Sequence, residues 1–251
     1  MSEGDHGQST MTKTSTLDIA DIQPMERETL QARVYRELRQ LLMVGRFRPG
    51  QVLKIRDLAE VFATSMQPIR ESIRQLIAER ALEAAANSSA RVPNLNVAQL
   101  EDLRLVRLAV EGLAAERATL VATPADVKDL MSVVDAELEA DQRQLVEASV
   151  SRNLEFHFRL YRLSGSQELL SIIEGLWLRL GPVIREAAEN FDAREGKGAA
   201  HHSAMLAALR RNDAAKVRQS VERDINHFFD LAVRRLEQAE ATKRSARRRA
   251  A

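Results

Sequence analysis

The segment ATSMQPIRESIRQLIAERALE, residues 63–83, is the stretch on which the fold prediction depends. Its apolar side chains recur at the spacing of one buried helical face: Ile69, Ile73, Leu76 and Ile77. Pro68 falls in the first turn, where a residue without an N–H is tolerated, and Ser65 is expected to cap that turn. A second face carries Gln67, Arg70 and Arg74, with Met66 beside them. This face is either simply solvated or used for binding.

The composition of the 251-residue chain favours a helical protein. Hydrophobic residues make up 45% of it and aromatic ones 4%, and there are only 10 glycines and 6 prolines. The absence of cysteine excludes disulfides, zinc–thiolate sites and a cysteine nucleophile. No apolar run approaches the roughly 18 residues of a membrane span, and the acidic N-terminus does not resemble a signal peptide. We therefore expect a soluble, cytoplasmic protein with no membrane partner.

The formal net charge of +1 hides an uneven distribution. Residues 29–92 carry 11 basic and 6 acidic side chains, whereas residues 93–242 carry 19 and 24. Residues 1–28 are acidic and polar and are predicted to be a disordered leader, and residues 243–251 form a tail with five basic side chains. A basic module joined to an acidic one indicates that a single module meets a polyanion.

The elements around the opening stretch predict a winged helix-turn-helix over residues 29–95. Helices are expected from Leu30 to about Gly45, over 55–62 and over 65–79, followed by a β-hairpin around Asn87. In this motif the second helix of the pair enters the DNA major groove, and the wing contacts the backbone or the minor groove. Arginine suits phosphate and guanine, and glutamine suits adenine. The polar face of the opening helix is therefore predicted to bind DNA.

Residues 96–242 are predicted to form an antiparallel helical bundle. Helical periodicity marks residues 97–120, 124–143, 145–163, 167–189, 199–211 and 214–240. Thr123-Pro124 reads as a cap followed by a proline start, and Gly181-Pro182 is a candidate bend. The predicted fold class is mainly α, with an N-terminal winged helix-turn-helix followed by an all-α antiparallel bundle.

Polar residues occupy core-like helical phases in this bundle: Asn153, His157, His202 and Asp224. Burying them without partners would cost several kcal/mol, so we expect them to satisfy one another. Two imidazoles, a carboxylate and an amide oxygen suit a divalent transition metal such as Zn²⁺, Ni²⁺ or Mn²⁺. A hydrogen-bonded polar cluster without metal fits the same spacing. His201 and His227 are alternatives with poorer phase.

Arg107 also shares a face with apolar residues and has Glu111 one turn later. One interpretation is an internal ion pair between these two side chains. The other is that Arg107 reaches into the polar cluster and binds the carboxylate of a small effector.

Over residues 30–240 the sequence resembles the GntR superfamily of bacterial transcriptional regulators, and specifically its FadR-type subfamily. The resemblance rests on GRFRPGQVLKIRDLAEVFATSMQPIRESIRQL in the first module. In the second module, an effector domain called FCD, it rests on LRLVRLAVEGLAAERA, NLEFHFRLYRLSG and HSAMLAALRRNDAA. It implies a homodimer that binds palindromic operator DNA and whose DNA affinity changes when a small effector binds in the FCD domain. The protein would be a repressor or an activator, with a repressor the first choice, and the second interpretation of Arg107 favours a carboxylate as the effector.

The resemblance also implies particular site residues. The DNA-contacting positions of the family correspond to Arg56, Ser65, Met66, Gln67, Arg70 and the wing around Ser89. The ligands of its metal-binding members correspond to Asn153, His157, His202 and Asp224, and an Arg and a Glu of its first effector helix correspond to Arg107 and Glu111.

The chain departs from the family pattern at several of these positions. Met66 and Gln67 stand where the family commonly has Arg or Thr, so a different operator sequence is expected. Ser89 replaces a wing glycine, and Asn153 and Asp224 exchange the usual Asp and His positions.

Two other classes of function remain open. A metal-dependent hydrolytic enzyme could use the same histidines, but the chain lacks an H-E-x-x-H-like motif and the basic module would be unexplained. The other is a helical scaffold that binds a protein partner.

Overall fold

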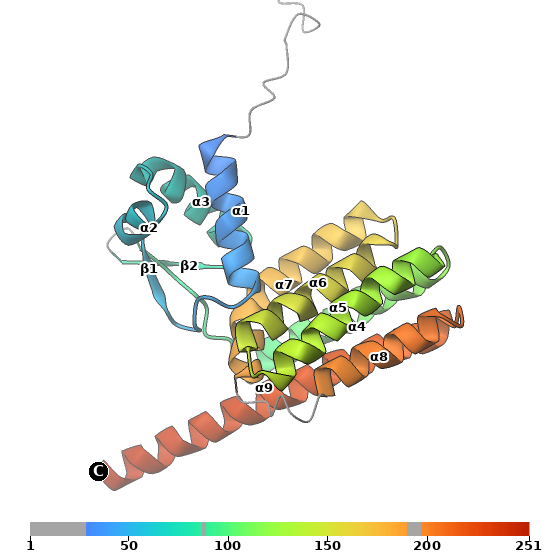
Figure 1. Ribbon diagram of the computed structural model, residues 1–251. Helices are drawn as coiled ribbons and strands as arrows, with labels where there is room; N and C mark the ends of the chain where they lie inside the picture. Colours follow the sequence, from blue (N-terminus) through green and yellow to red (C-terminus); the bar gives the residue numbers. More distant parts are fainter. Residues whose placement is uncertain (1–28, 87–88, 190–196, 251) are drawn as a thin grey trace, which may run out of the picture.

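The computed structural model describes residues 29–86, 89–189 and 197–250 (Figure 1). The expected leader, residues 1–28, and the wing tip at residues 87–88 lie outside the described residues. The rest confirms the predicted fold class: a small winged helix-turn-helix stands on one end of a larger helical bundle.

The first helix, α1, Leu30–Met43, has a side-chain cap at its start and a glycine turn at its end. The Thr29 hydroxyl accepts a hydrogen bond from the N–H of Ala32. At the other end Gly45 adopts a φ of +67°, a conformation that glycine takes without steric cost. The N–H groups of Gly45 and Arg46 bond back to carbonyls of the last helical turn, at 2.9 and 2.8 Å. This is a Schellman motif, as the position of Gly45 predicts.

The helix-turn-helix consists of α2, Ile55–Val61, and α3, Met66–Ala78. The opening stretch is therefore a helix, and Ile69, Ile73 and Leu76 are buried as predicted. The prediction that Ser65 caps α3 through its side chain is wrong. Ser65 does occupy the N-cap position, but its side chain makes no capping hydrogen bond. A cap usually bonds to the second or third helical N–H, and here the third helical residue is Pro68, which has none.

The wing is part of a three-stranded antiparallel sheet with the order β1-β3-β2. Strand β1, Val52–Lys54, pairs with β3, Ser89–Arg91, and β2, Glu83–Ala85, pairs with the other edge of β3. The predicted hairpin is confirmed. The extended piece before α2 joins it as the third strand.

The bundle contains α4, Val97–Thr119; α5, Pro124–Gln142; α6, Val146–Arg162; α7, Gln167–Ala188; α8, Lys197–Leu209; and α9, Ala214–Ala250. Helix α5 begins with the predicted Thr123 cap and Pro124. Helix α7 continues through Pro182 as one element. Helix α9 runs on to Ala250 and projects beyond the bundle, so the basic residues continue a helix that the sequence pattern ends near Glu240 (Figure 1). Among the described helices, none is long and apolar enough to cross a membrane.

The two modules meet where the C-terminal end of α1 packs against α7. A Cβ added to Gly181 would lie 2.0 Å from the carbonyl oxygen of Leu42, and one added to Gly45 would lie 2.2 Å from Cβ of Arg185. Only glycine permits such a close approach of two backbones. The ion pair Arg46–Glu147, at 2.8 Å, also links the modules. The winged helix-turn-helix module is therefore packed directly on the helix that carries Trp177.

Candidate functional site

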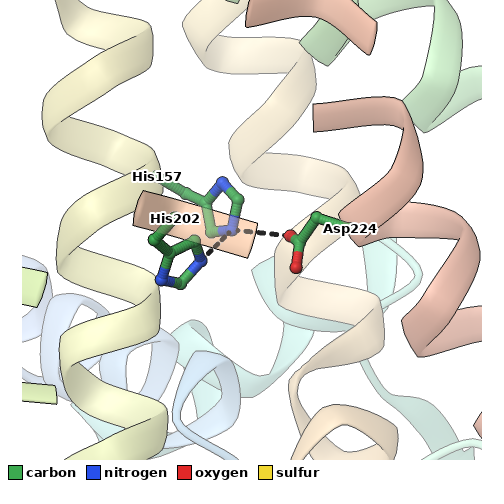
Figure 2. Close-up of side chains that lie close together, drawn as sticks. All are labelled: His157, His202 and Asp224. Carbon is green, nitrogen blue, oxygen red and sulfur yellow. Dashed lines mark hydrogen bonds and ion pairs between the residues drawn. The ribbon is translucent and has the colours of Figure 1, made fainter. Parts of the chain in front are cut away.

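Three of the predicted polar residues meet in the middle of the bundle (Figure 2). Nε2 of His157 lies 3.1 Å from Nε2 of His202 and 3.1 Å from Oδ2 of Asp224. The residues come from α6, α8 and α9, and the ligand atoms of all three lie within 4.8 Å of one another. Both histidines are buried, and the side chain of Asp224 is 17% exposed. Helix packing has thus brought together residues up to 67 positions apart in sequence, which phase alone could not establish.

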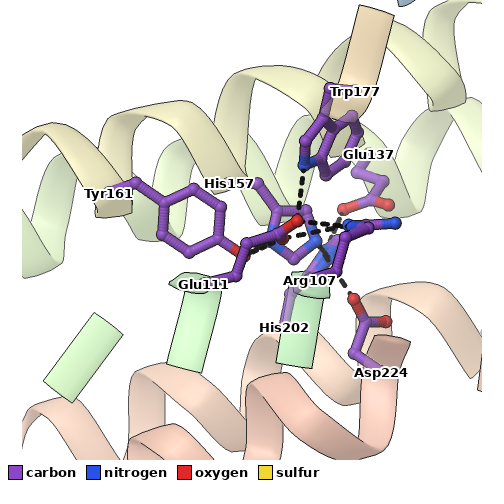
Figure 3. A network of polar contacts seen from close by, with 8 residues as sticks. All are labelled: Arg107, Glu111, Glu137, His157, Tyr161, Trp177, His202 and Asp224. Carbon is purple, nitrogen blue, oxygen red and sulfur yellow. Dashed lines mark hydrogen bonds and ion pairs between the residues drawn. The ribbon is translucent and has the colours of Figure 1, made fainter. Parts of the chain in front are cut away.

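The outward-facing nitrogens of both imidazoles are held by further buried groups (Figure 3). Nδ1 of His202 lies 2.6 Å from Oε2 of Glu137, and Nδ1 of His157 lies 3.0 Å from the hydroxyl of Tyr161. Tyr161 in turn donates to Oε2 of Glu111 at 2.7 Å. Such outer partners fix the orientation and tautomer of metal-binding histidines.

The hydrogen-bond network leaves the centre of the cluster with acceptors but no donor. Because Tyr161 donates its proton to Glu111, its oxygen accepts one from Nδ1 of His157; Glu137 accepts the proton on Nδ1 of His202. In the neutral rings both Nε2 atoms are then lone-pair acceptors, and they face each other and the Asp224 carboxylate. Three acceptors converge without a donor between them. A proton added to Nε2 of His157 could be donated to His202 or to Asp224, whereas a metal cation could accept a lone pair from all three.

The two acceptor separations that involve Nε2 of His157 fit a metal ion. Two ligands that are each about 2.1 Å from a metal and subtend a tetrahedral or octahedral angle lie about 3.0–3.4 Å apart. Both 3.1 Å separations fall in this range. Two imidazoles and one carboxylate form a site that suits Zn²⁺ and other first-row metals and leaves positions open for a ligand.

The titration behaviour of the cluster reflects the same convergence of acceptors. Burial by itself would lower the pKa of His202, but the negative charge and hydrogen bond of Glu137 outweigh it, so the pKa of His202 is raised. Burial by itself would raise the pKa of Asp224, but the hydrogen bond and charge of His157 outweigh it, so the pKa of Asp224 is lowered. Both shifts favour the charged forms, and a cation at the centre would take over the role of the proton.

Arg107 forms the internal ion pair with Glu111 that was one of its two interpretations. Its Nε and Nη2 atoms both donate to the Glu111 carboxylate, the second at 3.0 Å, and both side chains are almost fully buried. The guanidinium lies 4.6 Å from the ring of Trp177, whose indole N–H donates to Glu111 at 3.1 Å. Burial alone would lower the pKa of Arg107, but the Glu111 charge raises it. Nη1 makes neither of these bonds to Glu111.

A cavity of about 120 Å³ opens beside the three ligand atoms. One part of its wall is polar and contains Arg107, Asn153, His157 and Asp224. The other part is apolar and is formed by Ile184, Ile225, Phe228 and Leu231. The volume is well below the roughly 300–1,000 Å³ of sites for drug-sized ligands, so the cavity suits a small metabolite.

The remaining predicted residues of the cluster lie at its edge. Asn153 is one helical turn before His157, is half-buried and lines the cavity, so its place among the predicted ligands stays a prediction. His227 also lines the cavity, and its ring stacks at a tilt on that of His201, with 5.2 Å between the centroids.

Glu137 is a site residue that the sequence analysis missed. It lies 2.6 Å from His202 and is almost fully buried. It follows Leu130, Val133 and Val134 at spacings of seven, four and three residues, and all three are buried. The same criterion that identified the histidines, a polar residue in an apolar phase, would therefore have found it.

The second candidate site is a hollow between α2, the start of α3 and the wing. It is lined by Arg56, Met66, Arg70 and Ser89, all predicted DNA contacts, and by Lys54 and Arg91, which were not predicted. Ser65, Gln67 and Arg74 are exposed on the adjoining part of α3 and its N-cap. The amide of Gln67 donates to Glu71 at 2.7 Å, so a base contact would require this bond to break. The hollow therefore gathers four cationic side chains around the start of the recognition helix.

Comparison with known proteins identifies the class. Residues 30–92 match the model for bacterial regulatory proteins of the gntR family, and residues 102–227 match the FCD domain. The chain therefore belongs to the gntR family of regulators with an FCD domain, and it is a DNA-binding transcriptional regulator by family.

Individual relatives agree with this assignment. The HTH-type transcriptional regulator McbR of Escherichia coli is 28% identical over 190 residues, 75% of this chain and 86% of that protein. The gluconate operon transcriptional repressor of Bacillus subtilis is 23% identical, over 79% of this chain and 83% of that protein. The structure of E. coli McbR superposes with a TM-score of 0.79 at 25% identity, covering 83% of this chain and 99% of that one. These relatives are named as regulators, which favours regulation over the hydrolytic alternative.

Proposed function

We propose that this protein is a homodimeric repressor that binds a palindromic operator. A small carboxylate that enters the cavity of the FCD domain would change its affinity for DNA. The observation that carries the proposal is the convergence of the Nε2 atoms of His157 and His202 with Oδ2 of Asp224 at the cavity wall. A divalent metal such as Zn²⁺, Ni²⁺ or Mn²⁺ would supply a Lewis-acidic anchor for the carboxylate there.

The residues of this chain would position the effector around that anchor. Asn153 supplies an amide on the cavity wall, and Arg107 offers the part of its guanidinium that Glu111 does not engage. The apolar part of the wall would accept a hydrocarbon portion of the ligand. Together these features favour a small acid with an apolar end.

Helix α7 contacts both this cavity and the DNA-binding module, so it could transmit a conformational change from one to the other. It contributes Trp177 and Ile184 to the cavity wall, and Gly181, between them, contacts the backbone of Leu42 in α1. A ligand that displaces α7 would therefore also move α1, because the two backbones are in direct contact and no flexible side chain lies between them.

The test combines metal content with DNA binding. Elemental analysis of the purified protein should find Zn, Ni or Mn, and His157→Ala and His202→Ala should remove it while Asp224→Ala weakens it. The control is His201→Ala, because His201 is adjacent in sequence but outside the converging group. Small carboxylates should change the affinity for DNA flanking the gene only in the metal-loaded protein. No metal, combined with no thermal shift on adding any of the three ions, would overturn the metal-anchored part.

A further inference from the structure

The cavity of the FCD domain contains a buried carboxylate that the proposed metal site does not use. Asp141, in the last turn of α5, lines the cavity and is only 5% exposed. The hydroxyl of Ser149 donates a hydrogen bond to it. Among the described residues, the one opposite charge that acts on it is that of a protonated His202, an imidazole that Glu137 already binds. Carboxylates are rarely buried so deeply without a paired cation, so Asp141 lacks a partner.

The charges around the cavity leave a negative excess. Its wall carries three carboxylates, from Glu137, Asp141 and Asp224. Apart from imidazoles, the one basic side chain in the described part of the wall is Arg107, and Glu111 already balances its charge. A divalent metal would offset two of the three negative charges, but the carboxylate of an effector would add another. Because burial penalises unbalanced charge, a ligand that also brings a positive charge fits this cavity better than a purely anionic one.

Asp141 lies towards the end of the cavity that is remote from the metal ligands. On α6 the wall runs from His157 to Ser149, eight residues and about 12 Å along the helix. On α5 it runs from Glu137, which bonds to His202, to Asp141, one turn and about 6 Å further on. Asp141 and Ser149 also line a neighbouring hollow whose wall includes exposed residues of the α5–α6 turn. A short carbon chain can therefore place one polar end at the histidines and the other at Asp141.

We propose that Asp141 binds a positively charged ammonium group of the effector, so that the effector is a small amino acid rather than a plain carboxylic acid. The inference rests on the proposed carboxylate effector and identifies its second polar group. The carboxylate would lie at the histidines, and the apolar side chains of Val150, Ile184 and Ala187 would contact the carbon chain. An ammonium has three N–H donors, enough for the Asp141 carboxylate and the Ser149 hydroxyl. Binding would supply the cation that this buried carboxylate lacks.

Matched ligand pairs test this site on the full-length, metal-loaded protein. Calorimetry compares each plain acid from acetate to pentanoate with the same acid carrying an ammonium on its terminal carbon. At the chain length that fits, the ammonium should tighten binding at least about tenfold, as a charge-assisted hydrogen bond does. Asp141→Asn should abolish this gain and keep the affinity for the plain acid. Asp135→Asn is the matched control, because it removes the same charge from an exposed position on α5 and should keep the gain.

The stability of the ligand-free variant gives a second, independent readout. Asp141→Asn should melt at or above the temperature of the wild type, because a neutral amide replaces a buried charge that has no cation partner. A markedly lower melting temperature would mean that the protein itself already stabilises this carboxylate, and it would overturn the site.

The ligand series separates this inference from the proposed function. Equal affinities within every pair, with the plain acids binding, would overturn the ammonium site and leave the carboxylate effector standing. A gain that persists in Asp141→Asn would overturn the assignment to Asp141. If neither the plain acids nor the amino acids bind the metal-loaded protein, the proposed carboxylate effector is overturned as well.

Discussion

At the scale of single residues, Glu111 links Arg107, which lines the cavity, to Tyr161 and through it to His157. Its carboxylate accepts hydrogen bonds from Arg107, Tyr161 and Trp177, and it has no exposed surface. Removing one partner of such a buried pair typically costs about 3–5 kcal/mol, because the other charge is left unpaired. The same Tyr161 hydroxyl also bonds to Nδ1 of His157, so the position of Glu111 helps to fix the orientation of that imidazole.

That hydroxyl can be removed without changing the ring. Tyr161→Phe leaves Nδ1 of His157 without its partner and should lower metal affinity about 10–100-fold. It should also reduce the free energy of unfolding by about 1–3 kcal/mol, since a buried acceptor on Glu111 loses its donor. Metal titration and urea unfolding measure the two effects. Tyr35→Phe, at the only other tyrosine, should leave metal affinity unchanged.

A second residue-scale prediction concerns DNA. Arg70 lines the hollow beside the start of α3, so Arg70→Ala should weaken operator binding by about 1–3 kcal/mol per half-site, which a dimer experiences twice. Fluorescence anisotropy at physiological salt measures this loss. Arg211→Ala removes the same charge from an exposed position in the bundle and should have little effect. Equal affinities for the two variants would contradict the placement of α3 in the groove.

At the scale of elements, the packing of α1 against α7 depends on Gly181. Gly181→Ala would place its Cβ 2.0 Å from the Leu42 carbonyl and 2.6 Å from that of Met43. Both contacts are backbone, so α1 must move away, and we expect a lower melting temperature and a weaker effect of ligand on DNA affinity.

Gly175→Ala provides the control in the same helix. Nothing lies within 4 Å of a Cβ at this position, so the higher helix propensity of alanine should raise stability by up to about 1 kcal/mol. Opposite shifts of the two melting temperatures would confirm that the contact with α1, rather than helix propensity, is responsible. A melting temperature for Gly181→Ala at or above that of the wild type would show that the interface can yield.

At the scale of the whole molecule, charge separates the two modules. Residues 29–92 have 11 basic and 6 acidic side chains, and residues 93–242 have 19 and 24. Operator affinity should therefore fall steeply with salt, because phosphate contacts release counterions. Deleting residues 243–251, which carry five basic groups at the end of α9, should weaken non-specific binding more than specific binding. Salt titrations on operator and random DNA test this; an equal loss on both would make the tail part of the specific complex.

Sequence by itself determined most of the secondary structure and the family. The 3.6-residue periods of α3 and α4, the glycine after α1 and the proline at the start of α5 act within a few residues of chain, so their effect is visible without the fold. The phases of His157, His202 and Asp224 also identified them as inward-facing before any contact was known. Local signals were insufficient for the Ser65 cap, where Pro68 removed the expected donor, and for the end of α9.

Only the tertiary structure decided which inward-facing residues meet. Helical phase specifies a direction from one axis, but a contact depends on the offset and angle between two helices, which the packing of all the side chains sets. For this reason the sequence did not show that Glu137 of α5 lies against His202 of α8, or that Tyr161 of α6 and Trp177 of α7 both donate to Glu111 of α4. The contact of Gly181 with Leu42 could not be predicted for the same reason. A glycine has no side chain whose periodicity indicates a partner, so only the packed structure shows which backbone lies against it.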